Sequence, residues 1–90
     1  MFDIEKMVVI STGHLTQKTR DAIENDSFIQ AFWISEYGFI TYVSRSDLDN
    51  FSKDLIDCFV WAQDNGFDWI RWDVDGNKID LLPYYEYYED

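Results

Sequence analysis

The sequence has few basic residues and almost no cysteine, proline or histidine. Its 90 residues include one of each of the last three. A single cysteine excludes a disulfide within the chain, which favours a reducing compartment. No apolar run approaches the roughly 20 residues of a membrane span, and the first residues lack the basic and apolar segments of a secretory signal. We therefore expect a cytoplasmic protein that does not enter a membrane.

Acidic and aromatic side chains are abundant instead. Eighteen Asp and Glu stand against seven Lys and Arg, so the formal net charge is −11, and 19% of the residues are aromatic. Twelve of these acids and three of the bases fall within residues 47–90. Such a chain is repelled by nucleic acid and by anionic membranes and is attracted to basic surfaces. The length predicts one domain over residues 1–90, in which residues 83–90 form an aromatic-acidic tail.

The pattern of apolar residues predicts five strands and two helices. Strands are expected at residues 6–11, 28–35, 39–44, 67–74 and 78–82. Thr16 is the expected N-cap of a short first helix, and Ser46 that of a second helix that ends before Gly66. The second helix should bury one stripe of residues: Leu48, Phe51, Leu55, Cys58, Phe59 and Ala62. The order β-α-β-β-α-β-β predicts an α+β two-layer sandwich, with two helices on one face of a mostly antiparallel sheet.

The segment Asp73-Val74-Asp75-Gly76 resembles the start of a calcium loop. An EF-hand also needs further oxygen ligands and a Glu at its twelfth position, which here is Tyr84. Asp75-Gly76 between two alternating runs is instead typical of a β-hairpin turn. We therefore predict a hairpin, and neither a metal ion nor a cofactor.

The single histidine allows two interpretations. His14 follows Ser11 and Thr12 at a strand-to-helix junction, where backbone N–H groups can hold an anion. A small hydrolase or ligand-binding protein would require His14 to converge with Asp73 and Asp75 in a pocket. The other interpretation gives His14 a structural hydrogen bond. Cys58, on the apolar stripe, is predicted to be a buried and inert thiol.

A partner-binding surface is predicted on the outer face of the second helix and on the tail. A tryptophan among acids on a helix is typical of a contact anchor, unless the sheet or the tail covers it. Tyrosines in the tail offer large contact areas with hydroxyls for hydrogen bonds. The predicted set has no catalytic member and comprises Asp54, Asp57, Trp61, Asp64, Asp73, Asp75, Tyr85 and Glu86.

Four segments of the sequence form a recognisable set, namely ISTGHLTQKT, EYGFITYV, DLIDCFVWAQDNGFDWIRWDVDG and DLLPYYEY. Together they resemble a small bacterial domain family of unknown function that is found on plasmids, integrated elements and phages. The matching positions are Ser11, Thr12, His14, Thr16, Tyr37, Gly38, Phe39, Gly66, Asp73, Asp75, Leu82, Pro83 and Tyr84. The resemblance implies a mobile-element context and no particular activity.

These observations predict a small acidic, non-enzymatic binding protein. The favoured function is a mobile-element or phage inhibitor that occupies the basic site of a nucleic-acid-binding protein, as DNA-mimicking anti-CRISPR or anti-restriction proteins do. Mimicry would require the acids of residues 47–90 to gather on one face, because the mean surface charge is about one fifth that of duplex DNA. The alternatives are the hydrolase or ligand-binding protein described above and an antitoxin-like operon partner.

Overall fold

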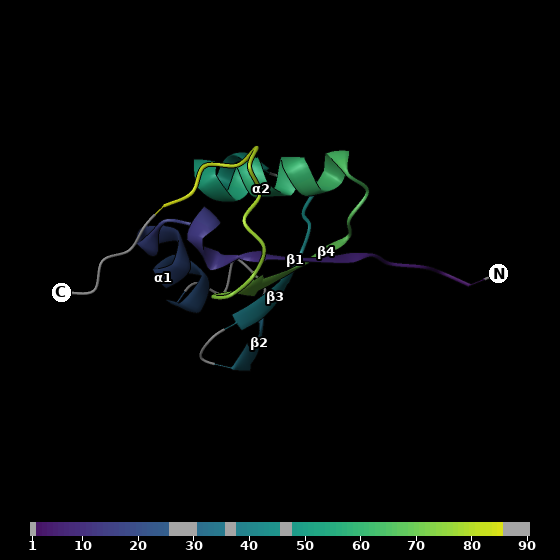
Figure 1. The fold of residues 1–90 in the computed structure, drawn as a ribbon, viewed down its shortest axis with the longest axis horizontal. Helices are drawn as coiled ribbons and strands as arrows, with labels where there is room; N and C mark the ends of the chain where they lie inside the picture. Colours follow the sequence, from purple (N-terminus) through teal and green to yellow (C-terminus); the bar gives the residue numbers. More distant parts are fainter. Residues whose placement is uncertain (1, 26–30, 36–37, 46–47, 86–90) are drawn as a thin grey trace.

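A computed structural model describes residues 2–25, 31–35, 38–45 and 48–85 of the chain (Figure 1). Its elements follow the order β-α-β-β-α-β, with two short 3-10 helices. They are β1 (Met7–Ser11), η1 (Thr12–His14), α1 (Gln17–Asn25), β2 (Ala31–Ser35), β3 (Gly38–Tyr42), η2 (Leu48–Asn50), α2 (Lys53–Asp64) and β4 (Trp69–Asp73). The predicted α+β class and both helices are confirmed.

The four strands form one mixed sheet in the order β1-β4-β3-β2. β4 pairs in parallel with β1 and antiparallel with β3, and β3 pairs antiparallel with β2. Two of the three pairings are antiparallel, as predicted, and the sheet is mixed because the last strand enters beside the first and runs in the same direction. Hydrophobic alternation identifies strands, but it does not identify their neighbours.

The core lies between the helices and one face of the sheet. Alternate strand residues such as Ile10, Ile70 and Trp72 form a single buried cluster with helical residues that include Ile23 and Leu55. The indole N–H of the fully buried Trp72 donates a hydrogen bond of 2.9 Å to the Thr41 hydroxyl. Because an unpaired buried N–H is unfavourable, this cross-strand bond lets a tryptophan occupy the centre of the core.

The second helix begins later than the sequence predicts. α2 starts at Lys53 with Ser52 as its N-cap, and the segment before it forms η2. The expected cap Ser46 lies outside the described residues. The predicted end is confirmed, because Gly66 follows the helix with a φ of 78°, a left-handed conformation that favours glycine.

The predicted fifth strand and its hairpin are absent from the described residues. A turn does follow β4, in which the Gly76 N–H donates to the Asp73 carbonyl at 2.9 Å. The chain then crosses the backbone of β1, so that Asn77 makes one parallel bridge with Ile10 on the free edge of β1. From there residues 78–85, the C-terminal segment, run back towards α2 (Figure 1).

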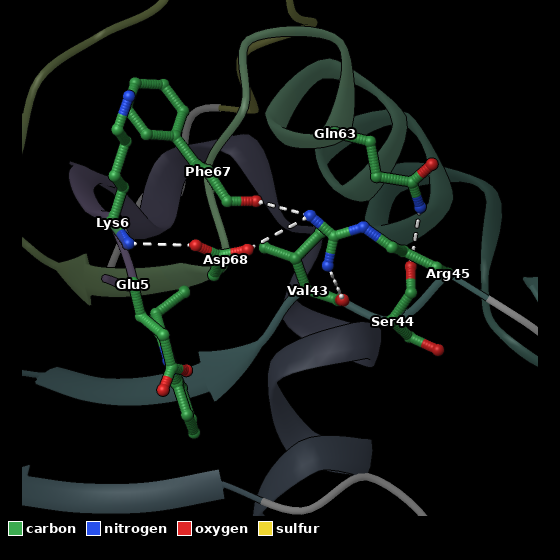
Figure 2. Close-up of polar contacts among 9 residues, drawn as sticks. Glu5, Lys6, Val43, Ser44, Arg45, Gln63, Phe67 and Asp68 are labelled. Carbon is green, nitrogen blue, oxygen red and sulfur yellow. Dashed lines mark hydrogen bonds and ion pairs between the residues drawn. The ribbon is translucent and has the colours of Figure 1, made fainter. Parts of the chain in front are cut away.

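Arg45 ties the end of β3 to the turn before β4. Its guanidinium donates to the carbonyls of Val43 and Phe67 at 3.4 and 3.2 Å, and it forms an ion pair with Asp68 at 3.3 Å (Figure 2). The Lys6 N–H donates to the same Asp68 carboxylate at 2.9 Å. Arg45 therefore links two chain segments, and Asp68 connects the segment at Lys6 to them.

Candidate functional site

His14 holds the C-terminal segment on the body of the domain. The imidazole is 1% exposed, with Nδ1 2.8 Å from the Pro83 carbonyl and Nε2 2.9 Å from the Ile79 N–H. A carbonyl only accepts and a backbone N–H only donates, so both bonds require the neutral tautomer with its proton on Nδ1. Neither nitrogen is then free to act as a base, and the structural interpretation of His14 is the one that the geometry favours.

Two tyrosines extend this attachment. The Tyr84 ring lies edge-on to His14 with a centroid distance of 5.3 Å, and its hydroxyl is 3.3 Å from the Ser11 hydroxyl. The Tyr85 N–H donates to the Gly13 carbonyl at 2.7 Å. The beginning of the predicted tail is therefore docked on the fold, while Glu86 and the residues after it lie outside the described part of the chain.

The helical pattern predicted that Asp54 lies on the outer face of the second helix, and this prediction is wrong. It is 6% exposed and accepts hydrogen bonds from the Thr16 N–H and the Thr19 hydroxyl, both at 2.8 Å. Burial by itself raises the pKa of Asp54, but hydrogen bonds from Ser52, Thr16 and Thr19 outweigh it and lower the pKa below its usual value. The carboxylate thus joins the first turn of α2 to the N-terminus of α1, where helix dipoles favour a negative charge.

Trp61 lies at a shallow hollow between α2 and the C-terminal segment. The hollow has a volume of about 370 Å³, and its lining consists of Asp57, Val60, Trp61, Leu81, Leu82 and Pro83. Trp61 is half-buried and rests against Phe67 at a centroid distance of 5.8 Å. The C-terminal segment flanks the indole without closing over it, so part of the indole is accessible.

The hollow combines apolar walls with one carboxylate. Asp57 forms an ion pair of 3.0 Å with Lys53, which is 86% exposed. An exposed ion pair one helical turn apart contributes little to stability, so an incoming cation can compete for Asp57. Burial and the charges of Asp54 and Asp57 raise the pKa of Tyr85, which places that phenol in the same negative field.

The other predicted site residues are dispersed. Asp64 is exposed at the end of α2. Asp73 accepts from the Asp75 N–H at 2.8 Å and lies 3.9 Å from the Arg71 guanidinium, so it serves the turn after β4. Of the predicted site residues, only Asp57 and Trp61 line the hollow. Tyr85 is not a lining residue, but the negative charges of Asp54 and Asp57 act on its hydroxyl.

Sequence reasoning missed the apolar part of the hollow. Leu81 is 85% exposed and Val60 is 40% exposed, yet both belong to runs that the sequence assigned to a strand and a helix. A signal was present in Leu81-Leu82-Pro83, because two leucines before a proline cannot both face the core of a strand. Their position opposite Trp61 depends on the His14 contacts, which no local pattern shows.

Other chemistries find little support in the described residues. Their acids, histidine and cysteine include no group of three that could hold a metal ion. The Cys58 thiol is buried, and burial together with the charges of Asp54 and Asp57 raises its pKa, which disfavours the reactive thiolate. Among the helices described, none is long and apolar enough to cross a membrane.

The chain forms a small α+β domain with a shallow hollow between α2 and the C-terminal segment. A family model described as the C-terminal domain of DUF5983, a family of unknown function, matches residues 7–87. The chain belongs to this family. Comparison with curated proteins gave no match, and comparison with solved structures gave none either.

Proposed function

We propose that this domain is a non-enzymatic binding protein that seats a basic side chain of a partner protein in the hollow beside Trp61. The observation that carries the proposal is the lining, in which the Asp57 carboxylate stands beside the indole of Trp61 and the apolar surface of Leu81. A lysine or arginine has a matching shape, with an apolar stem and a cationic end. The stem would lie on Leu81 and Trp61, and the cation would lie near Asp57 and the indole face.

The net charge of the chain supports a basic partner. A formal −11 on 90 residues attracts cationic surfaces from a distance and raises the rate of association at low salt. The hollow would then supply the desolvated anchor that charge alone lacks. Asp54 is buried and Asp57 is paired, so the contact we propose is a single pocket and not a stripe of acids along α2.

The narrower form of the proposal names the class of partner. Proteins that bind nucleic acid expose closely spaced lysines and arginines, which is the surface that this domain would occupy. The domain would then act as an inhibitor of the anti-restriction or anti-CRISPR type, carried by a phage or another mobile element. This form rests on the charge of the chain and on the mobile-element context that the sequence resemblance implies.

Two variants and a matched control test the hollow. The wild-type chain is used to capture its partner from the native host, and surface plasmon resonance then compares Asp57→Asn, Trp61→Ala and the control Asp64→Asn. We expect Trp61→Ala to weaken binding by about 2 kcal/mol through faster dissociation. Asp57→Asn should weaken binding more than Asp64→Asn, although each variant removes one charge from α2.

If Asp57→Asn and Asp64→Asn weaken partner binding equally, the binding depends on the net charge of the chain and not on the hollow. The narrower form is tested by competition. If the captured partner binds DNA or RNA, the wild-type chain should displace the nucleic acid, and Trp61→Ala should do so poorly. Simultaneous binding of the chain and the nucleic acid would refute the inhibitor form and leave the binding proposal standing.

A further inference from the structure

The face of the sheet opposite the helices carries an exposed aromatic cluster. The Trp69 ring on β4 contacts Tyr42 on β3 at a centroid distance of 5.1 Å and Phe32 on β2 at 6.3 Å. Met7, Phe32 and Tyr42 are 46%, 52% and 49% exposed. Scattered single apolar residues are normal on a surface, but a contiguous group of this kind marks an interaction surface.

The strand register brings these side chains into two adjacent rows. Tyr42, Trp69 and Met7 lie side by side across β3, β4 and β1. The next row on the same face runs through Phe32, Ile40, Arg71 and Val9. Because α1 and α2 both pack into the cluster on the other face, the two rows have no helical cover in the described structure.

This face carries charges of both signs. Arg71 is the one charged residue in the two rows, and Glu5 and Asp73 border them, so these three residues carry a formal charge of −1 on a chain of −11. Glu5 accepts a bond of 2.6 Å from the Trp69 indole N–H, and Asp73 lies 3.9 Å from the Arg71 guanidinium. Because Arg71 lies within the rows and the two carboxylates lie at their border, the face has groups of opposite charge that can oppose each other when two copies meet.

We infer that a second copy of this chain docks on this face to form a two-fold dimer. An isologous interface brings the same patch of both copies together, so the aromatic cluster of one copy packs on that of the other. The charges are also self-complementary, because Arg71 of each copy can oppose Glu5 or Asp73 of its partner. The inference concerns the sheet face and does not depend on the hollow at α2.

The size of the aromatic face determines how tightly two copies are expected to bind each other. Four strands spaced about 4.8 Å apart and five residues long cover roughly 300 Å² before border residues are added. A standard interface removes about 800 Å² from each partner, so this dimer falls at the weak end of the range. We expect dissociation constants from about 10 to a few hundred micromolar.

Sedimentation equilibrium tests the inference on the full chain, from about 10 μM to about 1 mM and at two salt concentrations. We expect a monomer–dimer equilibrium that salt strengthens, because screening reduces the repulsion between two copies of net charge −11. Salt should therefore strengthen the dimer, whereas it should weaken the proposed contact with a basic partner. Failure of one proposal is thus distinguishable from failure of the other.

Two substitutions locate the interface. Phe32→Lys and Tyr42→Lys should each raise the dissociation constant at least tenfold, although each added positive charge by itself favours association of an acidic chain. Leu81→Lys makes the same change of charge at the hollow and should leave the dimer intact. Circular dichroism checks the fold of each variant, and amide shifts of the wild type should change with concentration along β2, β3 and β4.

A chain that stays monomeric over the whole concentration range would overturn the inference. Loss of the dimer in Leu81→Lys to the same extent as in Phe32→Lys would overturn it as well. If a lysine variant fails to fold, the concentration-dependent shifts of the wild type decide the matter. Shifts confined to α2 and the C-terminal segment would place self-association at the hollow and would contradict the inference.

Discussion

The backbone N–H of Ile79 donates a hydrogen bond of 2.9 Å to Nε2 of His14, 65 residues earlier in the chain. The other ring nitrogen lies 2.8 Å from the Pro83 carbonyl. One side chain thereby fixes two points of the C-terminal segment, and this segment supplies Leu81, Leu82 and Pro83 to the hollow. The sole histidine therefore supports the candidate site from a distance without lining it.

His14→Ala should loosen the C-terminal segment and destabilise the fold. The change leaves a partly buried carbonyl and a partly buried N–H without their imidazole partner and opens a cavity, so we expect a loss of about 2–4 kcal/mol in urea unfolding. Trypsin should also cleave the folded variant faster after Lys78, which lies inside the segment. In the wild type, long-range nitrogen spectra of the ring should show the proton on Nδ1, and a proton on Nε2 would contradict the arrangement.

Asp54 should make stability depend on pH in the acidic range. Although burial raises its pKa, the hydrogen bonds from Ser52, Thr16 and Thr19 bring it below the usual value. A carboxyl with a lowered pKa in the folded state contributes stability that is present above its unfolded pKa of about 4 and is lost as the pH falls through the folded pKa. Asp54→Asn should therefore lower the free energy of unfolding by about 1–3 kcal/mol at pH 7.

The difference between wild type and Asp54→Asn should shrink as the pH falls below about 4. Urea unfolding at a series of pH values measures it. Asp64→Asn is the matched control, because Asp64 is exposed on the same helix and should change stability little at any pH. A constant difference between wild type and Asp54→Asn across the acidic range would contradict this role of the carboxylate.

Local patterns in the sequence were sufficient for the four strands, both helices and several of their ends. Thr16 caps α1 as predicted, since its hydroxyl accepts from the Thr19 N–H at 3.2 Å. The same patterns failed where long-range contacts decide the structure. Residues 78–82 do alternate, but the Ile79 N–H bonds to a histidine side chain and the Leu82 N–H closes a local turn at 3.1 Å, so no strand forms.

The candidate site was predictable in part for the same reason. Asp57 and Trp61 share one side of α2, and the helical pattern alone brings them together. Asp54 lies on that side by sequence, but it occupies the first turn of α2, where the helix meets Thr16 and Thr19 of α1. A signal existed in Ser52-x-Asp54 at a helix start and in the two threonines near Thr16. Joining these signals requires knowledge of how the two helices pack.

Cys58 should not react while the protein is folded. The thiol is 1% exposed, and burial with the charges of Asp54 and Asp57 raises its pKa. Ellman's reagent should modify it only as the protein opens, with a rate that rises steeply as urea approaches the unfolding midpoint. Release of one equivalent of chromophore within seconds in the absence of urea would mean that the thiol is accessible and ionised.

Two glycines should respond differently to alanine because different groups surround them. A Cβ at Gly76 would lie 2.5 Å from backbone atoms of Ile10, where the chain crosses β1, and the backbone has no room to yield. A Cβ at Gly13 would meet the Tyr84 ring, a side chain that can swing away with the loss of its contacts to Ser11 and His14. We expect Gly76→Ala to cost about 3 kcal/mol and Gly13→Ala about 1 kcal/mol.

A double-mutant cycle separates the two mechanisms. In a Tyr84→Ala background, Gly13→Ala should cost almost nothing, whereas Gly76→Ala should keep its full cost. Urea unfolding of the five variants and the wild type, fitted with a common slope, measures these free energies. A full cost for Gly13→Ala without Tyr84 would show that the strain lies in the backbone of η1 and not in the docked tyrosine.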